Sequence, residues 1–529
     1  MCFLEVPLKH NRQNEKLPEK LQLRSLIFGN YGLGRALIYT LVFKAAIFAI
    51  GVLLIGVLAT RTGLASNSSS GYQVFGLDQW PHVEAYTDFR DLYMKDLVAP
   101  FLQGHDAYQL GTIVYNYPPL FLYLLSFFAQ VNIVWFPAIP LVAFDILTTI
   151  PVYLIAKQFL FKGNSKMAFA VAIIWAVNPI NLFYNDLMWL NPGPTTFFLM
   201  TGIYYFLKRD WYFSAFMLAV STGFKQITVL AVPVLLILLW NGTAPKKITE
   251  SRVRREGGGK NEVAGDPGEN SSSIHSPLSN FGTGIRSALV RAGQEIWFGL
   301  ILLRPVLLYL ATFVGFLFII SLPYIITEPQ NYFYSLQLPI FGYPPGTSAG
   351  YPSTFSYDLS QPTRITTFLG LLNFTNLQSV AVTSYQLLDY AFAFAYVALL
   401  IYILHARLEP SGTNTLILVM AGFLAFFGLY GRGIYKYYFA TLTPLALPFL
   451  AEKKQMLILE GLSLAILFVP RVATPWMAVL LLTLLPRFLN RSTIQIFDST
   501  GGGDLATDLK LQNSGKANDK MRPMSQESI

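Results

Sequence analysis

Apolar runs of helical length recur along almost the whole chain. A helix needs about 20 apolar residues to cross the hydrocarbon core of a bilayer. Runs near that length predict about twelve spans. They lie near 36–59, 131–156, 167–184, 193–207, 211–223, 226–240, 304–325, 384–404, 413–430, 437–450, 456–470 and 472–489. We therefore expect an all-α fold: a polytopic transmembrane helical bundle with long outer loops that contain interfacial helices.

Lysine and arginine residues beside the spans set the predicted orientation, because short cytoplasmic flanks carry an excess of them. They are frequent before the first span, after 131–156 and in 241–303. This pattern places both termini in the cytoplasm and the loops 60–130 and 326–383 on the outer side. The alternation of inner and outer loops agrees with these charges only if the short apolar stretch 117–129 lies in the interface and does not cross the membrane.

The polar segments complete the predicted organisation. Residues 1–35 form a cytoplasmic N-terminal segment, and residues 36–489 form the transmembrane domain. The cytoplasmic insert 241–303 is rich in glycine, serine and charge over 255–280, which predicts a disordered linker. Residues 490–529 are polar without an apolar pattern, which predicts a disordered cytoplasmic tail.

The composition agrees with a membrane protein and excludes several other classes. Hydrophobic residues make up 53% of the 529 residues and charged residues 13%, against roughly 25% charged in soluble proteins. A single cysteine, Cys2, excludes an internal disulfide and a thiolate metal cluster. The net charge of +9 is sorted to the predicted cytoplasmic side, which argues against a nucleic-acid partner. We expect an integral protein of a prokaryotic plasma membrane or of the endoplasmic reticulum membrane.

The outer loop 60–130 holds a candidate acid–base group. Apolar residues recur at helical spacing between 88 and 102, which predicts a short interfacial helix that begins at Asp88. A carboxylate at this position suits a plain helix cap and equally a general base. The sequence leaves both roles open.

The predicted topology leaves eight cations at outer span edges or in outer loops, against the usual bias. They are Arg61, Arg90, Lys95, Lys225, Arg364, Arg432, Lys436 and Arg471, and the candidates for binding an anion are Lys225, Arg432, Lys436 and Arg364. Residues of this kind either extend to lipid headgroups or bind an anion.

Two charges lie deep within predicted spans. Lys44 and Asp145 are roughly 13 and 16 Å from the inner ends of their helices, at about 1.5 Å per residue. Because two lone charges in hydrocarbon are costly, their similar depth predicts a structural Lys44–Asp145 ion pair.

The stretch AYTDFRDLYMKDLVAPFLQGHDAYQLGTIVYNYPPLFLYLL resembles the first outer loop of GT-C glycosyltransferases that use polyprenyl-phosphate sugars. Proteins of this kind include the first mannosyltransferase of GPI anchors and the mycobacterial phosphatidylinositol mannoside mannosyltransferases. Asn178-Pro179, Lys225 in GFKQ and Tyr435-Lys436-Tyr437-Tyr438 extend the resemblance to about residue 450. The chain departs from the family where many relatives carry a Gly-Gln-x-Asp-like patch, because it has Asn185-Asp186 there.

The resemblance implies a hexosyltransferase, and by likeness a mannosyltransferase, with a GT-C-like bundle. A hexose would pass from a polyprenyl- or dolichyl-phosphate sugar to a lipid-linked or glycan acceptor at the outer face, with inversion. Asp88 would act as general base beside Asp91, whose DxxD spacing is not a DxD metal motif. No cofactor or bound metal would be required, and a divalent cation would be allowed.

The resemblance also implies binding residues. The donor phosphate would bind Lys225, Lys436, Arg432 and Arg364, and the substrates would contact Tyr93, Tyr108, Tyr117 and Asp186. Asp186 would also be the second candidate for the base.

Two other hypotheses remain open. A secondary transporter or a flippase of lipid-linked substrates would concentrate ionisable groups near the midplane, with broken helices around them. A noncatalytic scaffold subunit of a glycosylation complex would share the predicted topology.

Overall fold

The computed structural model describes residues 29–61, 89, 93–94, 97–105, 108, 117–131, 135–243, 279–333, 378–429, 437–451 and 453–468. Helices make up the regular structure of these ranges, and no strand occurs in them. The predicted all-α class is therefore confirmed for this part of the chain.

The main helices follow the predicted apolar runs as far as 456–470, with one difference: the helix over the run 304–325 already begins at Ser279, inside the segment 241–303 that was predicted as a disordered insert. They are α2 (Leu33–Arg61), α5 (Ala138–Ile155), α6 (Ser165–Ala176), α8 (Pro192–Leu207), α9 (Trp211–Phe224), α10 (Ala231–Thr243), α12 (Ser279–Thr327), α15 (Gln378–His405), α16 (Gly412–Leu429) and α18 (Lys453–Phe468). Shorter elements lie between them: α3 (Ala99–Leu102), α4 (Pro119–Ala129), η3 (Ala156–Leu160), α7 (Pro179–Asn181), η4 (Leu182–Leu187), η5 (Gln226–Leu230), α17 (Tyr438–Leu442) and η7 (Thr443–Ala451). The predicted run 472–489 lies outside the described residues.

Several of these helices are long and apolar enough to cross a membrane. Within the described ranges, four qualify by length and composition: Leu33–Leu53, Ala138–Leu160, Gln226–Thr243 and Leu303–Thr327. A fifth is added if the bent pair Ser165–Ala176 and Pro179–Leu187 counts as one span. The chain is therefore a multi-pass membrane protein, while the count of about twelve spans stays a prediction.

The predicted span 167–184 is broken. Helix α6 ends at Ala176, and the chain bends by 43° before α7 and η4 continue to Leu187. Pro179 at the start of α7 explains the break, because the residue before a proline is disfavoured in the helical conformation. The Asn178 side chain then accepts from the backbone N–H groups of Ile180 and Asn181, which caps the new helix.

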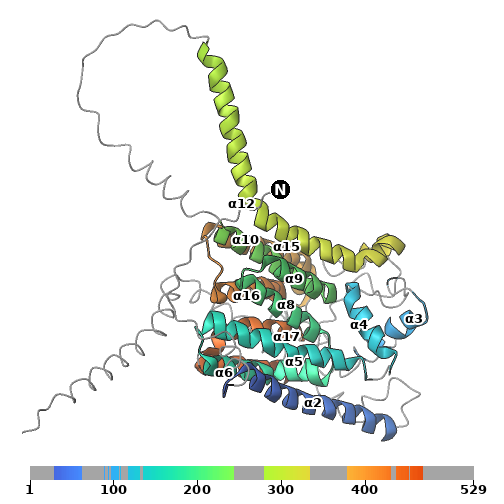
Figure 1. The fold of residues 1–529 in the computed structure, drawn as a ribbon. Coiled ribbons are helices and arrows are strands. Elements are labelled where there is room, and N and C mark those ends of the chain that lie inside the picture. Colours follow the sequence, from blue (N-terminus) through green and yellow to red (C-terminus); the bar gives the residue numbers. More distant parts are fainter. Residues whose placement is uncertain are drawn as a thin grey trace, which may run out of the picture.

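Helix α4 is too short to span. Its 11 residues extend about 16 Å, roughly half of the hydrocarbon thickness. Figure 1 shows α4 and α3 together at one end of the bundle, beside the ends of α5, α9 and α12. Of the predicted interfacial helix 88–102, the structure describes α3 and isolated positions before it.

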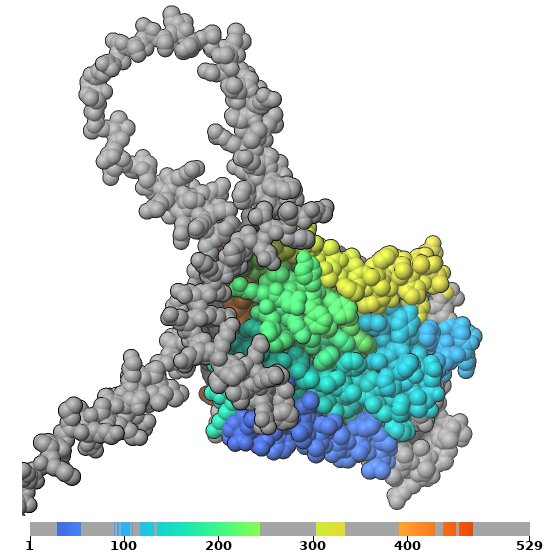
Figure 2. All heavy atoms as spheres, in the orientation of Figure 1, coloured from blue at the N-terminus to red at the C-terminus, as the bar shows by residue number. Residues whose placement is uncertain are grey.

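The helices pack into one bundle with apolar edges. Helix α8 lies between α5 and α9, α9 packs on α12, and α2 packs on α5. Figures 1 and 2 show α2 and α12 at opposite edges of this face. Leu53 on α2 and Ile319 on α12 are 64% and 62% exposed, which suits contact with lipid tails.

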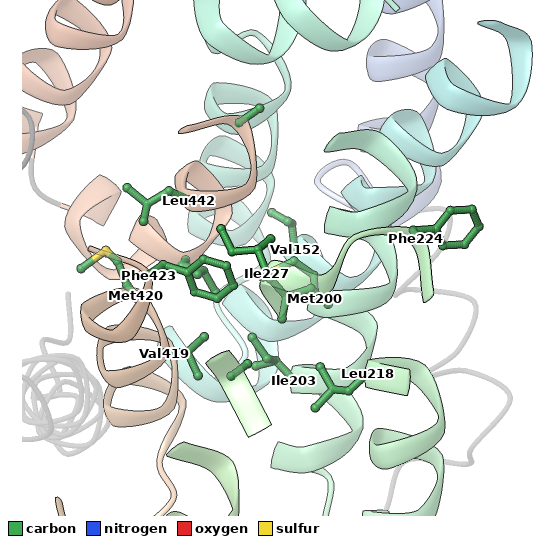
Figure 3. Packing of buried hydrophobic residues seen from close by; sticks show 14 of the residues in the cluster. Val152, Met200, Ile203, Leu218, Phe224, Ile227, Val419, Met420, Phe423 and Leu442 are labelled. Atoms are coloured by element: carbon green, nitrogen blue, oxygen red, sulfur yellow. The ribbon is translucent and has the colours of Figure 1, made fainter. Parts of the chain in front are cut away.

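The core joins the two halves of the chain. Figure 3 shows Val152 of α5 and Met200 of α8 close to Ile227 of η5, with Met420 and Phe423 of α16 on the other side. All five side chains are at least nine-tenths buried. This packing holds η5 against α5, α8 and α16, and the candidate site lies where η5 begins.

Candidate functional site

Lys225 is the one predicted donor-phosphate residue within the described part of the chain. Helix α9 ends at Phe224, and Lys225 has an extended backbone (φ −156°, ψ 120°) before η5 begins at Gln226. Its backbone N–H still donates to the Ser221 carbonyl, at 3.0 Å. The side chain is only 2% exposed, so Lys225 does not extend to the surface.

The Lys225 ammonium group lies among an amide and aromatic rings. Its Nζ donates to Asn191 Oδ1 at 2.9 Å. Nζ also lies 3.7 Å from the ring centroid of Tyr438, 4.4 Å from that of Tyr437 and 5.7 Å from that of Tyr117. Each cation–π contact of this kind contributes about 0.5–2 kcal/mol. We call these five residues the outer lysine site.

The outer lysine site collects residues from distant parts of the sequence at one end of the bundle. Asn191 directly precedes α8, Tyr117 lies two residues before α4, and Tyr437 precedes α17. The predicted topology places all of these helix ends on the outer side. The site therefore lies where helices begin after outer turns or loops.

The turn that positions Asn191 contains a strained residue, Trp189. Trp189 has φ 56°, in the left-handed region that bulky residues rarely adopt. Its indole N–H donates to the Asp186 carbonyl at 3.1 Å, and its ring packs 5.5 Å from that of Phe48 and 5.3 Å from that of Phe89. Because the indole is fully buried, surrounding contacts hold this conformation in place.

Of the three predicted tyrosines, Tyr117 belongs to the outer lysine site, and Tyr108 and Tyr93 pack near it. Tyr108 donates its hydroxyl to the Tyr117 carbonyl at 2.9 Å and packs 4.6 Å from the ring of Tyr324 on α12. Tyr93 is buried 4.9 Å from the ring of Phe121. Tyr108 thus fixes the position of Tyr117, whereas the described contacts of Tyr93 are with α4.

Asp186 lies in a separate, fully buried cluster. Lys44 Nζ donates to Asp145 and, at 2.7 Å, to Asp186. Asn185 Nδ2 donates to Asp145 Oδ1 at 2.8 Å. The predicted Lys44–Asp145 pair is confirmed, and Asp186 adds a second carboxylate. We call these four residues the Lys44 network.

Several predicted site residues lie outside the described residues. They are Asp88, Asp91, Arg364, Arg432 and Lys436. Their roles as general base, neighbouring acid and phosphate ligands stay predictions. Within the described ranges, no group of three or more His, Cys, Asp or Glu is arranged to hold a metal ion.

Sequence reasoning missed two polar contacts. Asn191 is the hydrogen-bond partner of Lys225, and its position between an outer turn and Pro192 was the available signal. Asn178 donates to both carboxylate oxygens of Glu460, at 3.1 and 3.0 Å, and to Ser463. An acidic residue inside the predicted span 456–470 was itself the signal for this second contact.

Residues 78–341 match the family described as GPI transamidase subunit PIG-U. Over this region the chain is similar to the PIG-U family. The matched region contains Asn191 and Lys225 and ends before Tyr437 and Tyr438. No curated protein matches the chain.

The PIG-U match bears on the earlier resemblance to glycosyltransferases. PIG-U is a family of membrane proteins with a GPI-related role, which agrees with the multi-pass fold. Its description names a subunit of a transamidase complex and does not name sugar transfer. Hexose transfer and its specificity for mannose therefore stay predictions.

Proposed function

We propose that this chain is a membrane subunit of a GPI transamidase and that its outer end holds the lipid-linked glycan. The observation that carries the proposal is the match of residues 78–341 to the PIG-U family. A transamidase of this kind replaces the C-terminal hydrophobic tail of a protein with a glycolipid anchor. The complex must therefore bind a ligand that is apolar at one end and polar at the other.

The arrangement of the bundle suits such a ligand. Exposed apolar side chains on α2 and α12 face the surroundings along the bundle. The outer lysine site places a cation, an amide and three aromatic rings at one end of that bundle. Lipid tails can then lie along the helices while a polar headgroup lies at the outer end.

Co-purification tests this proposal. The full chain carries an affinity tag in membranes of its own organism and is extracted in mild detergent. We expect the catalytic subunit of the GPI transamidase to elute with it in stoichiometric amount. The Lys225→Met variant should co-elute equally well, because that side chain is buried within the chain. Elution of the tagged wild type without any transamidase subunit would reject the proposal.

Glycosyl transfer is the second candidate, and the packing of Phe89 favours it. Phe89, next to Asp88, is 1% exposed and packs on Trp189, which is linked to Asp186. In that mechanism the acceptor hydroxyl attacks the anomeric carbon as its proton passes to Asp88. The bond between that carbon and the phosphate oxygen breaks, and Lys225 stabilises the charge on the leaving lipid phosphate.

A transfer assay tests the second candidate. Membranes containing the chain receive a polyprenyl-phosphate hexose and candidate acceptors, and Asp88→Asn is compared with the wild type. Removal of a general base should lower the rate about 10²–10⁴-fold. Wild-type transfer by the variant would remove Asp88 as the base. Repetition with a chelator decides whether a divalent cation takes part.

A further inference from the structure

Three helices begin at the outer lysine site. Helix α4 begins two residues after Tyr117, α8 begins directly after Asn191, and the apolar helix Gln226–Thr243 begins directly after Lys225. The N-terminus of a helix carries about half a positive elementary charge. Because Lys225 adds a full positive charge, the described part of the site is strongly positive.

Asn191 adds a hydrogen-bond donor that no described residue uses. Its Oδ1 accepts from Lys225, and because an ammonium group only donates, the orientation of the amide is fixed. The Nδ2 group is buried in a residue that is 1% exposed, and no acceptor among the described residues bonds to it. The side chain does not cap α8 either. A buried donor without an acceptor costs about 1–3 kcal/mol.

Both observations point to the same kind of ligand. A positive site favours an anion, and the Asn191 amide requires an acceptor oxygen. Phosphate combines negative charge with several acceptor oxygens, and helix N-termini bind it in many proteins. The predicted outer position of the site places it at the headgroup level of a membrane lipid.

We infer that the outer lysine site binds a phosphate diester, the one that joins lipid and glycan in the ligand proposed above. This inference rests on the proposed function for the identity of the lipid. One phosphate oxygen accepts from Lys225 Nζ and another from Asn191 Nδ2. The half-buried Tyr438, whose ring covers Nζ at 3.7 Å, turns aside to admit the phosphate. The ring then flanks the neighbouring sugar.

Lipid binding by the purified full chain tests the inference. Native mass spectrometry measures binding of short-chain phosphatidylinositol, with diacylglycerol of the same chain length as the neutral control. Inorganic phosphate is the third probe, since it shares the phosphate but lacks the lipid. We expect phosphatidylinositol to bind at least about 10-fold more tightly than diacylglycerol, because hydrogen bonds to charged groups are the strong ones.

Two variants remove the site in different ways. Lys225→Met removes the charge. Asn191→Asp preserves the shape but supplies a carboxylate to Lys225, so the fold is retained while the anion is excluded. Both should weaken binding of phosphatidylinositol by at least about 10-fold, and Lys225→Arg should retain it. If Asn191 were only structural, Asn191→Asp would bind like the wild type, and that result would overturn the inference.

Lys208 provides a matched control. Its Nζ lies 5.7 Å from the ring of Tyr204, the same distance as between Lys225 and Tyr117, but at the predicted inner end of α8. Lys208→Met should leave binding unchanged. An equal loss in this variant, or equal binding of diacylglycerol, would also overturn the inference. Binding of inorganic phosphate alone, lost in Lys225→Met, would support a phosphate site and overturn its assignment to a lipid.

The two proposals can fail separately. If phosphatidylinositol binding depends on Lys225 but no transamidase subunit co-elutes, the proposed function fails and the phosphate site stands. If the transamidase co-elutes and Asn191→Asp binds the lipid normally, the phosphate site fails and the proposed function stands.

Discussion

The Lys44 network gives a sharp prediction about stability, because one ammonium group contacts two carboxylates. Lys44, Asp145 and Asp186 are all 0% exposed. Lys44 donates to both carboxylates, and Asn185 supports one of them. When all three groups are ionised, the network carries one more negative than positive charge.

The order of stabilities follows from the charges that each variant leaves behind. Lys44→Met leaves two buried carboxylates without a cation and should cost about 3–5 kcal/mol, as removal of one partner of a buried ion pair does. Asp145→Asn leaves the neutral Lys44–Asp186 pair and should cost only about 1.5–3 kcal/mol, the value of a hydrogen bond to a charged group. The double variant, which combines Lys44→Met with Asp145→Asn, leaves Asp186 alone and should be less stable than Asp145→Asn.

An isolated Lys44–Asp145 pair would give the opposite order. The double variant would then be neutral and more stable than Asp145→Asn, which would strand a lone lysine. Thermal unfolding in one detergent, followed by the loss of monodisperse protein on size exclusion, measures the order. Lys208→Met is the control for a lost surface lysine. A double variant more stable than Asp145→Asn would refute the role given to Asp186.

Two further predictions concern the packing and the break in the bundle. Gly193→Ala would place a Cβ 2.4 Å from the Leu141 carbonyl oxygen and should cost about 1–3 kcal/mol, whereas Gly315→Ala meets nothing within 4 Å and should be tolerated. Equal melting temperatures for these two variants would contradict the close approach of α8 to α5. Asn178→Ala removes the amide that donates to Glu460 and should cost about 1–3 kcal/mol, with recovery when Glu460→Gln is added. Unchanged thermal stability of Asn178→Ala would show that the carboxylate does not need that donor.

Most helix positions were predictable from the sequence because the helices span apolar runs of suitable length, whereas the first part of α12, from Ser279, precedes its apolar run 304–325. The break at Asn178 was not predicted, since the apolar character of the sequence continues across it. The Asn178-Pro179 pair carries the information, through the conformational restriction before proline and the cap that Asn178 provides.

The polar contacts were predictable only where the topology fixes depth. Lys44 and Asp145 could be paired because both lie in long spans whose inner ends are marked by charge. Asp186 could not be added, because the bend after α6 carries η4 back towards α2, and a count of residues along a straight helix does not include that bend. Lys225 was singled out by its charge at an outer edge, but its burial depends on tyrosines far away in the sequence.

The Lys44 network also bears on the hypothesis that the chain is a transporter. A broken helix that brings Asp186 to a buried lysine is an arrangement that transporters use near the midplane. Here the charged groups bond to one another and are closed off from the surface. We therefore expect a structural role for the network, and flux of a fluorescent lipid-linked sugar in proteoliposomes would contradict that expectation.

The glycolipids that accumulate when this chain is depleted from its own cells test the central proposal most directly. A subunit of the transamidase acts after the glycolipid is finished. Mass spectrometry should then find the complete GPI in excess, together with proteins that retain their C-terminal signal. Accumulation of a glycolipid that lacks one hexose would contradict the proposal, because it would place the chain among the enzymes that build the glycan.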